Sequence, residues 1–79
     1  MGIKDFLGKD VYYDKTGQMI FANQKDGHQQ LIINVRGWGA IQNHFRDEND
    51  NYDTEEATVF QDKLGEFIAE AINEKIKTL

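Results

Sequence analysis

The C-terminal third of the chain has the pattern that most constrains the fold. Apolar residues recur there at steps of three and four, which is the period of an amphipathic helix with one buried stripe. Asp53 is a candidate N-cap with Glu56 three residues later, and Lys75 and Lys77 place positive charge in the last turn. The sequence therefore predicts a helix over residues 54–79, whose buried stripe consists of Phe60, Leu64, Phe67, Ile68, Ala71, Ile72, Ile76 and Leu79.

Gly65 interrupts this helix near the edge of the predicted stripe. A glycine costs roughly 1 kcal/mol relative to alanine in a helix interior, so its presence calls for a reason. Two interpretations stay open from the sequence. Either a strand or an aromatic ring approaches the helix backbone at Gly65, or the glycine is a tolerated small residue.

The residues before this helix predict three short strands. The segments 10–14, 18–23 and 30–36 are rich in β-branched and aromatic residues, and tight-turn sequences separate them. In the third strand, alternation predicts that Leu31, Ile33 and Val35 face the core. A short helical face follows at Trp38, Ile41 and Phe45. Residues 1–9 form a lead-in with a helical pattern, and residues 46–53 form an acidic loop.

These elements predict one small α+β domain over residues 1–79. We expect a three-stranded antiparallel β-meander, covered on one face by the long C-terminal helix, with a short helix between them. The order of elements is β-β-β-α-α. In this arrangement Ile33, Phe67 and Ile68 form one buried cluster.

Composition and charge limit the classes of function. The 79 residues carry a formal net charge of −5 and contain no cysteine, and the chain also has no serine, so a serine nucleophile is excluded. Eight of the acidic residues fall within positions 47–66, a surface that repels nucleic-acid phosphates and favours solubility or a basic partner. The N-terminal residues lack the apolar run of a signal peptide, and no segment is long enough to span a membrane. We expect a cytoplasmic protein, of bacterial type on its size and lack of cysteine.

Candidate cofactor sites are weak in this sequence. Asp47, Asn49 and Asn51 match the first half of a calcium-binding EF-hand loop, but Tyr52 and Thr58 stand where that loop needs glycine and glutamate. His28 and His44 are far apart and have no cysteine to complete a zinc site. We therefore predict no metal, no cofactor and no enzymatic activity.

The function that remains is binding to other proteins. One helix covers one face of a sheet, yet both faces carry large apolar residues, so the opposite face is a candidate surface for a partner or for a homodimer. Its candidate residues are Trp38, Arg36, Ile32 and Tyr12. Two alternatives stay open, namely a nucleic-acid binder that stacks bases on the aromatic sheet face and a small enzyme that is active only as an oligomer.

Overall fold

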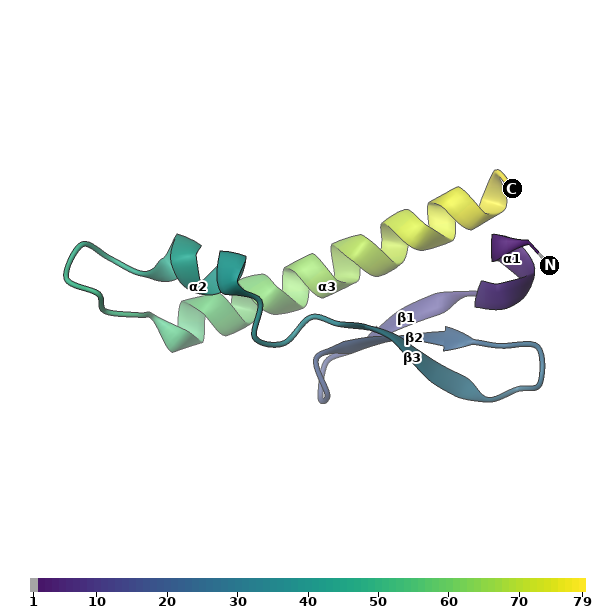
Figure 1. Cartoon of the computed structure of the whole chain (residues 1–79), viewed down its shortest axis with the longest axis horizontal. Helices are drawn as coiled ribbons and strands as arrows, with labels where there is room; N and C mark the ends of the chain where they lie inside the picture. Colours follow the sequence, from purple (N-terminus) through teal and green to yellow (C-terminus); the bar gives the residue numbers. More distant parts are fainter. Residues whose placement is uncertain (1) are drawn as a thin grey trace.

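The computed structural model describes residues 2–79, so the first residue of the lead-in lies outside the described residues. It confirms the α+β fold. Strands β1 (Val11–Asp14), β2 (Met19–Asn23) and β3 (Gln29–Asn34) form one antiparallel sheet in the order β1-β2-β3. Helix α1 (Ile3–Leu7) precedes the sheet, and α2 (Gly39–Phe45) and α3 (Thr54–Lys77) follow it. The fold is elongated, with α3 running along the sheet and the loop between α2 and α3 projecting at one end (Figure 1).

Helix α3 begins where the sequence predicts. The side chain of Asp53 accepts a hydrogen bond of 2.9 Å from the Glu56 backbone N–H, which satisfies one of the free amide groups at the helix start. Glu55 and Glu56 lie in the first turn and Lys75 and Lys77 in the last, so the charges complement the helix dipole at both ends.

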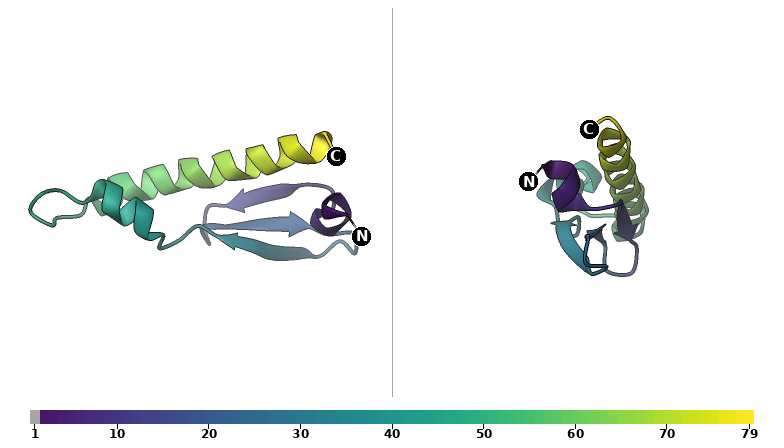
Figure 2. Two further views of the ribbon diagram at one scale, coloured as in Figure 1. Left: turned by 45° about the horizontal axis from the view of Figure 1, so that its top comes forward. Right: turned by 90° about the vertical axis from the view of Figure 1, so that its right-hand side faces the viewer.

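The helix packs mainly against β1 and less against β2. Both views in Figure 2 place α3 beside β1, with β3 farthest from it. The sequence suggested that one helix would cover the whole face of the sheet. Instead α3 lies over one side, because β1 is an edge strand whose outward backbone groups need partners.

A side chain of α3 supplies those partners. The backbone N–H of Val11 donates to Asn73 Oδ1, and Asn73 Nδ2 donates to the Val11 carbonyl oxygen, both at 2.8 Å. Two residues farther along β1, the hydroxyl of Tyr13 donates to Asp62 Oδ1 at 2.7 Å. These contacts fix which side of α3 faces the sheet.

Gly65 lies where the helix comes closest to β1. A Cβ atom at this position would overlap the ring of Tyr13. Of the two interpretations of this glycine, the structure confirms the close approach of an aromatic ring.

Strand β3 departs from the predicted alternation. Ile20 on β2 pairs with Ile33, and Phe21 pairs with Leu31, so Ile32 is an extra residue in a β-bulge. Before the bulge, the side chains of β3 therefore point to the faces opposite to those that regular alternation predicts. Ile33 and Val35 lie toward the core as predicted, but the assignment of Leu31 to the core was wrong, because its side chain is 51% exposed.

The core lies between the sheet and one side of α3. Its buried residues are Val11, Tyr13, Ile20, Ala22, Val35 and Ala69, with Leu7, Ile32, Ile33, Leu64, Ile68 and Ile72 packed against them. Of the predicted buried cluster, Ile33 and Ile68 pack against the core but are half-buried, and the assignment of Phe67 to the core was wrong, because it is 67% exposed.

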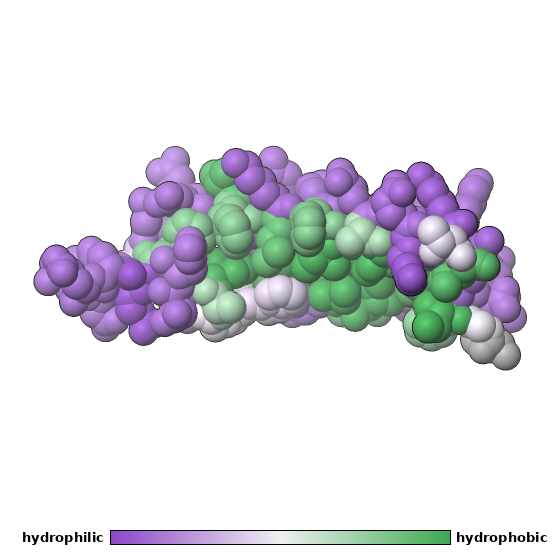
Figure 3. Space-filling view, turned by 90° about the horizontal axis from the view of Figure 1, so that it is seen from above, coloured by the Kyte–Doolittle hydropathy of each residue, from purple (hydrophilic) through white to green (hydrophobic). Residues whose placement is uncertain are grey.

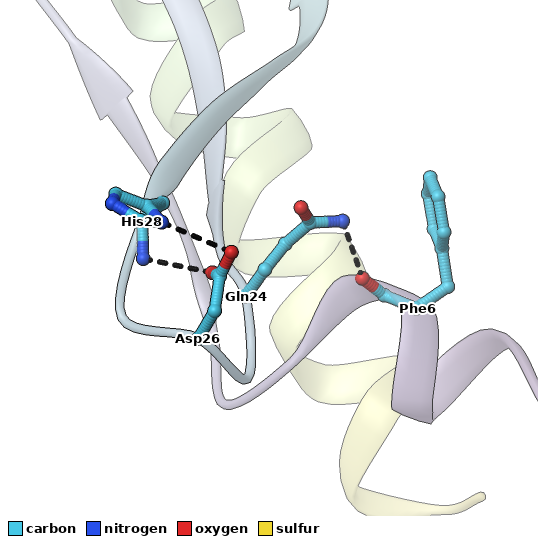
Figure 4. Close-up of polar contacts among 4 residues, drawn as sticks. All are labelled: Phe6, Gln24, Asp26 and His28. Carbon is cyan, nitrogen blue, oxygen red and sulfur yellow. Dashed lines mark hydrogen bonds and ion pairs between the residues drawn. The ribbon is translucent and has the colours of Figure 1, made fainter.

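Helix α1 is attached to the turn that joins β2 and β3. Gln24 Nε2 donates to the Phe6 carbonyl oxygen at 3.0 Å (Figure 4). In the same turn the Asp26 carboxylate accepts from the His28 backbone N–H and lies 3.0 Å from His28 Nδ1. The hydrogen bond between the two side chains raises the pKa of His28 and lowers the pKa of Asp26.

Candidate functional site

The sheet face that points away from α3 carries a row of three apolar side chains. Tyr12 pairs with Phe21, and Phe21 pairs with Leu31, so all three lie on this face. The rings of Tyr12 and Phe21 are stacked with centroids 5.8 Å apart. Tyr12 and Phe21 are half-buried, so the two rings cover part of each other's surface.

The structure brings together only part of the candidate surface predicted from the sequence. Ile32 does not join Tyr12 on the outer face, because the β-bulge turns it toward the core cluster. Leu31 takes the place on that face that the alternating pattern gave to Ile32.

Trp38 and Arg36 lie beyond the end of β3. The indole Nε1 of Trp38 donates to the Asn34 carbonyl oxygen at 2.7 Å, which holds the ring against the end of the strand. Trp38 is 36% exposed. Arg36 is exposed, and its backbone N–H donates to Asn34 Oδ1 at 2.9 Å. The predicted residues are thus spread over the end of β3 and the outer face.

A second candidate surface lies on α3 itself. Two rows of side chains run along this helix. The first, called here the inner row, repeats every four residues and faces β1. It consists of Ala57, Gln61, Gly65, Ala69 and Asn73, of which all but Asn73 are buried.

The second row, called here the α3 seam, lies roughly 130° around the helix from the inner row at 3.6 residues per turn. It consists of Phe60, Leu64, Phe67 and Ala71. Phe67 is 67% and Phe60 39% exposed, Ala71 is exposed and Leu64 is half-buried. The two phenylalanines of α3 therefore lie at its surface, while Ala57, Gly65 and Ala69 are buried.

A broad apolar surface is visible on the side of the molecule where α3 lies. Figure 3 shows hydrophobic residues in a continuous band along much of the molecule, bordered on one side by hydrophilic residues. Contiguous exposed apolar surface of this kind is typical of interaction sites.

Helix α2 borders the seam at the N-terminal end of α3. The ring centroid of Phe60 lies 5.3 Å from that of Phe45 and 6.1 Å from that of His44. An open groove of about 350 Å³ lies between the two helices, lined by Ala40, Ile41, His44, Phe60 and Leu64. The ring of His44 lies against those of Phe60 and Phe45.

Charged side chains flank the seam on the side away from the sheet. Lys63 and Glu70 are seven residues apart, on either side of Phe67, and both are exposed. Neither takes part in the ion pairs found within residues 2–79, which join His28 to Asp26, Arg46 to Asp50 and Lys77 to Glu74.

In the acidic loop, the carboxylate of Asp47 is hydrogen-bonded to the backbone of the loop. Asp47 Oδ1 accepts hydrogen bonds of 2.9 Å from the N–H groups of both Asn49 and Asn51. These hydrogen bonds lower the pKa of Asp47, and the bond from the Asn51 backbone has the largest effect. Within residues 2–79 no group of three or more histidine, aspartate or glutamate side chains is placed to hold a metal ion.

The largest pKa shift within residues 2–79 is that of Tyr13. Burial, followed by the hydrogen bond to Asp62, raises the pKa of its phenol well above the ordinary value. Tyr13 packs under α3 against Gly65, whereas Asp26, His28 and Asp47 lie in two exposed turns at other places in the fold. The perturbed groups of residues 2–79 therefore do not converge on one cleft.

Sequence reasoning missed the seam because it counted all apolar residues of α3 as one stripe. The signal that separates the two rows is their spacing together with residue size. Phe60, Leu64, Phe67 and Ala71 follow a 4-3-4 spacing, whereas the residues of the inner row, three of which are alanine or glycine, follow a strict four-residue spacing. Small residues mark the side of a helix where a neighbour's backbone or ring comes close.

No protein-family model, curated protein or solved structure matches this chain. None of the helices formed by residues 2–79 combines the length and the apolar character needed to cross a membrane.

Proposed function

We propose that this chain is a small, non-enzymatic protein-interaction module that binds its partner through the α3 seam. The observation that carries the proposal is the exposure of Phe67. This residue lies in the middle of the longest helix, has apolar residues one turn before and after it on the same side, and is 67% exposed. Aromatic residues at the centre of an apolar patch are the usual anchors of protein interfaces.

The radius of gyration and the exposed area of the chain support the binding of a partner. A compact domain of 79 residues has a radius of gyration of about 12 Å, whereas that of this chain is 14.9 Å. A compact monomer of 9.1 kDa exposes about 4,900 Å², whereas this chain exposes 5831 Å². The surplus of roughly 900 Å² is close to the ~800 Å² that each partner contributes to an interface of standard size.

The proposal replaces the surface expected from the sequence with a different one. Tyr12 and Phe21 already stack on each other, and Trp38 is hydrogen-bonded to the end of β3. Helix α2 packs only at the half of the seam formed by Phe60 and Leu64, and it leaves Phe67 and Ala71 exposed. The apolar surface that most needs a partner is therefore on the helix.

Site-specific photo-cross-linking in the cells that produce the protein tests this proposal. Phe67 is replaced by a benzophenone amino acid, and the matched control carries the same group at the exposed position Glu48, in the loop between α2 and α3. We expect a defined cross-linked product from position 67 and none from position 48. The partner is then identified by mass spectrometry and its binding reproduced with purified proteins. Equal products from both positions, or none from position 67, would contradict the proposal.

A further inference from the structure

We infer that the partner of the α3 seam is a second copy of this chain, whose α3 packs antiparallel against the first to form a symmetric homodimer. This inference rests on the proposed function, since it names the occupant of the same surface. It follows from three properties of the described residues, namely the sizes of the seam side chains, the groove beside α2 and the charges that flank the seam.

The sizes of the seam residues are self-complementary in an antiparallel pair. Helices pack along a seam whose apolar residues repeat every 3.5 residues, and the 4-3-4 spacing of the seam has that repeat. A two-fold axis between positions 65 and 66 places Phe60 opposite Ala71 of the second copy, and Leu64 opposite its Phe67. Each of the four layers then joins a larger residue to a smaller one, as close packing requires.

The groove beside α2 fits the same arrangement. Leu64 and Phe60 form one wall of this groove, and Ala40, Ile41 and His44 form the other. Phe67 of the second copy lies opposite Leu64 at the mouth of the groove. Its exposed ring therefore enters an apolar space that the first copy leaves open, and the two-fold axis repeats the contact on the other side.

The flanking charges are also self-complementary. Residues beside the seam of a helix pair form ion pairs across it and set the relative orientation of the helices. In the antiparallel arrangement Lys63 lies beside Glu70 of the second copy, and Glu70 beside its Lys63. In a parallel arrangement Lys63 would instead lie beside Ile68 of the second copy, so the charges favour the antiparallel pair.

A charge-exchange experiment tests the arrangement. The variants Lys63→Glu and Glu70→Lys each place two like-charge contacts in the homodimer, and we expect each to raise its dissociation constant by about 10-fold or more. An equimolar mixture of the two variants restores both attractive contacts, so we expect a heterodimer with a dissociation constant within about 3-fold of that of the wild type. Sedimentation equilibrium of mixed and unmixed samples measures these constants, with one variant carrying a fluorophore at its N-terminus.

Two further variants complete the test. Glu48→Lys makes the same charge change as Glu70→Lys at an exposed position of the loop between α2 and α3, away from the seam, and we expect wild-type dimerisation. Phe67→Ser removes the central anchor, and we expect a folded monomer. Circular dichroism establishes that each variant retains the wild-type helix content.

The outcomes separate the two proposals. A wild-type chain that stays monomeric at about 1 mM, near the weak limit of specific binding, would overturn the inference. A dimer that Phe67→Ser leaves intact, or a mixture that does not restore affinity, would also overturn it. If the chain is monomeric and Phe67 cross-links to a different identified protein that also binds when purified, the interaction module stands and the homodimer is wrong. If Phe67 gives no product at all, both are wrong.

Discussion

The inner row and the α3 seam belong to one helix but differ in what they touch. The inner row consists of small or polar residues and meets β1, where Gly65 receives the ring of Tyr13 and Asn73 pairs with the backbone of Val11. The seam includes the two exposed phenylalanines of α3, and only its Phe60 and Leu64 half packs against other parts of the chain. The polar and steric needs of an edge strand, more than the number of apolar atoms, determine which side of α3 is buried.

The largest expected effect contrasts the core with the seam. Ile20 is fully buried, so Ile20→Ala should lower the free energy of unfolding by about 2–5 kcal/mol. Phe67→Ala removes more atoms but from an exposed position, and should change it by less than about 0.5 kcal/mol in the monomer. Urea denaturation at a concentration below that of association measures both. Comparable losses would show that Phe67 belongs to the core and would break the comparison.

Asn73 should give the next largest effect. Asn73→Ala leaves the Val11 N–H and carbonyl without partners, so we expect a loss of about 1–3 kcal/mol. Hydrogen exchange at the Val11 amide should accelerate with it. The control Glu74→Ala removes only an exposed ion pair with Lys77, worth at most about 1 kcal/mol. An unchanged Val11 exchange rate in Asn73→Ala would show that the helix does not close the edge of β1.

The same substitution, glycine to alanine, should have different effects at Gly65 and at Gly39. Gly65→Ala gains about 1 kcal/mol of helix propensity but forces a methyl group into the ring of Tyr13, which costs about 1–3 kcal/mol, so we expect a net loss of about 1 kcal/mol. Gly39→Ala adds the same methyl group in open space and should not destabilise the fold. Thermal melting of the two variants compares them directly. A higher melting temperature for Gly65→Ala would mean that α3 stands farther from β1.

The smallest effect concerns the Tyr13 hydroxyl. Tyr13→Phe removes the hydrogen bond to Asp62 and should cost about 1 kcal/mol at neutral pH. Because the fold raises the pKa of this phenol, the unfolded chain releases its proton first, near pH 10. The contribution of Tyr13 is therefore complete below pH 10 and is lost as the pH rises above it. Tyr13→Phe should flatten that alkaline loss, as measured by urea denaturation between pH 8 and 11.

A control at the neighbouring tyrosine sharpens this prediction. Tyr12 lies on the outer face, and its hydroxyl makes no hydrogen bond within residues 2–79. Tyr12→Phe should therefore change the stability at pH 7 by less than about 0.5 kcal/mol. If Tyr12→Phe cost as much as Tyr13→Phe, the bond to Asp62 would carry no stability of its own.

Local patterns were sufficient to predict the elements and their order. The repeat of apolar residues located α3, Asp53 marked its first turn, and the turn sequences separated three strands. One of the two interpretations of Gly65, the approach of a strand or an aromatic ring, is also correct, but the sequence did not identify Tyr13 as that ring. The elements and their order depend on neighbours in the sequence, so a single sequence contains them.

Two features could not be predicted, because they depend on contacts between distant residues. The bulge at Ile32 arises from the pairing of β3 with β2, and it moved Leu31 and Ile32 to the faces opposite to those predicted. The rotation of α3 follows from contacts of Asn73 and Asp62 with β1, which lie 62 and 49 residues away in the chain. This rotation exposes Phe67 and moves the candidate site from the sheet to the helix.

The bulge at Ile32 also bears on unwanted polymerisation. An edge strand with a regular row of free amide and carbonyl groups is a template for the strand of another molecule, and an irregular strand pairs poorly in this way. β3 is the edge that α3 does not cover, and the extra residue interrupts its regular spacing. A chain shortened by deletion of Ile32 would keep Leu31 opposite Phe21 and Ile33 opposite Ile20, but would present a smooth edge. We expect that deletion to retain the fold while increasing the tendency to form β-rich aggregates.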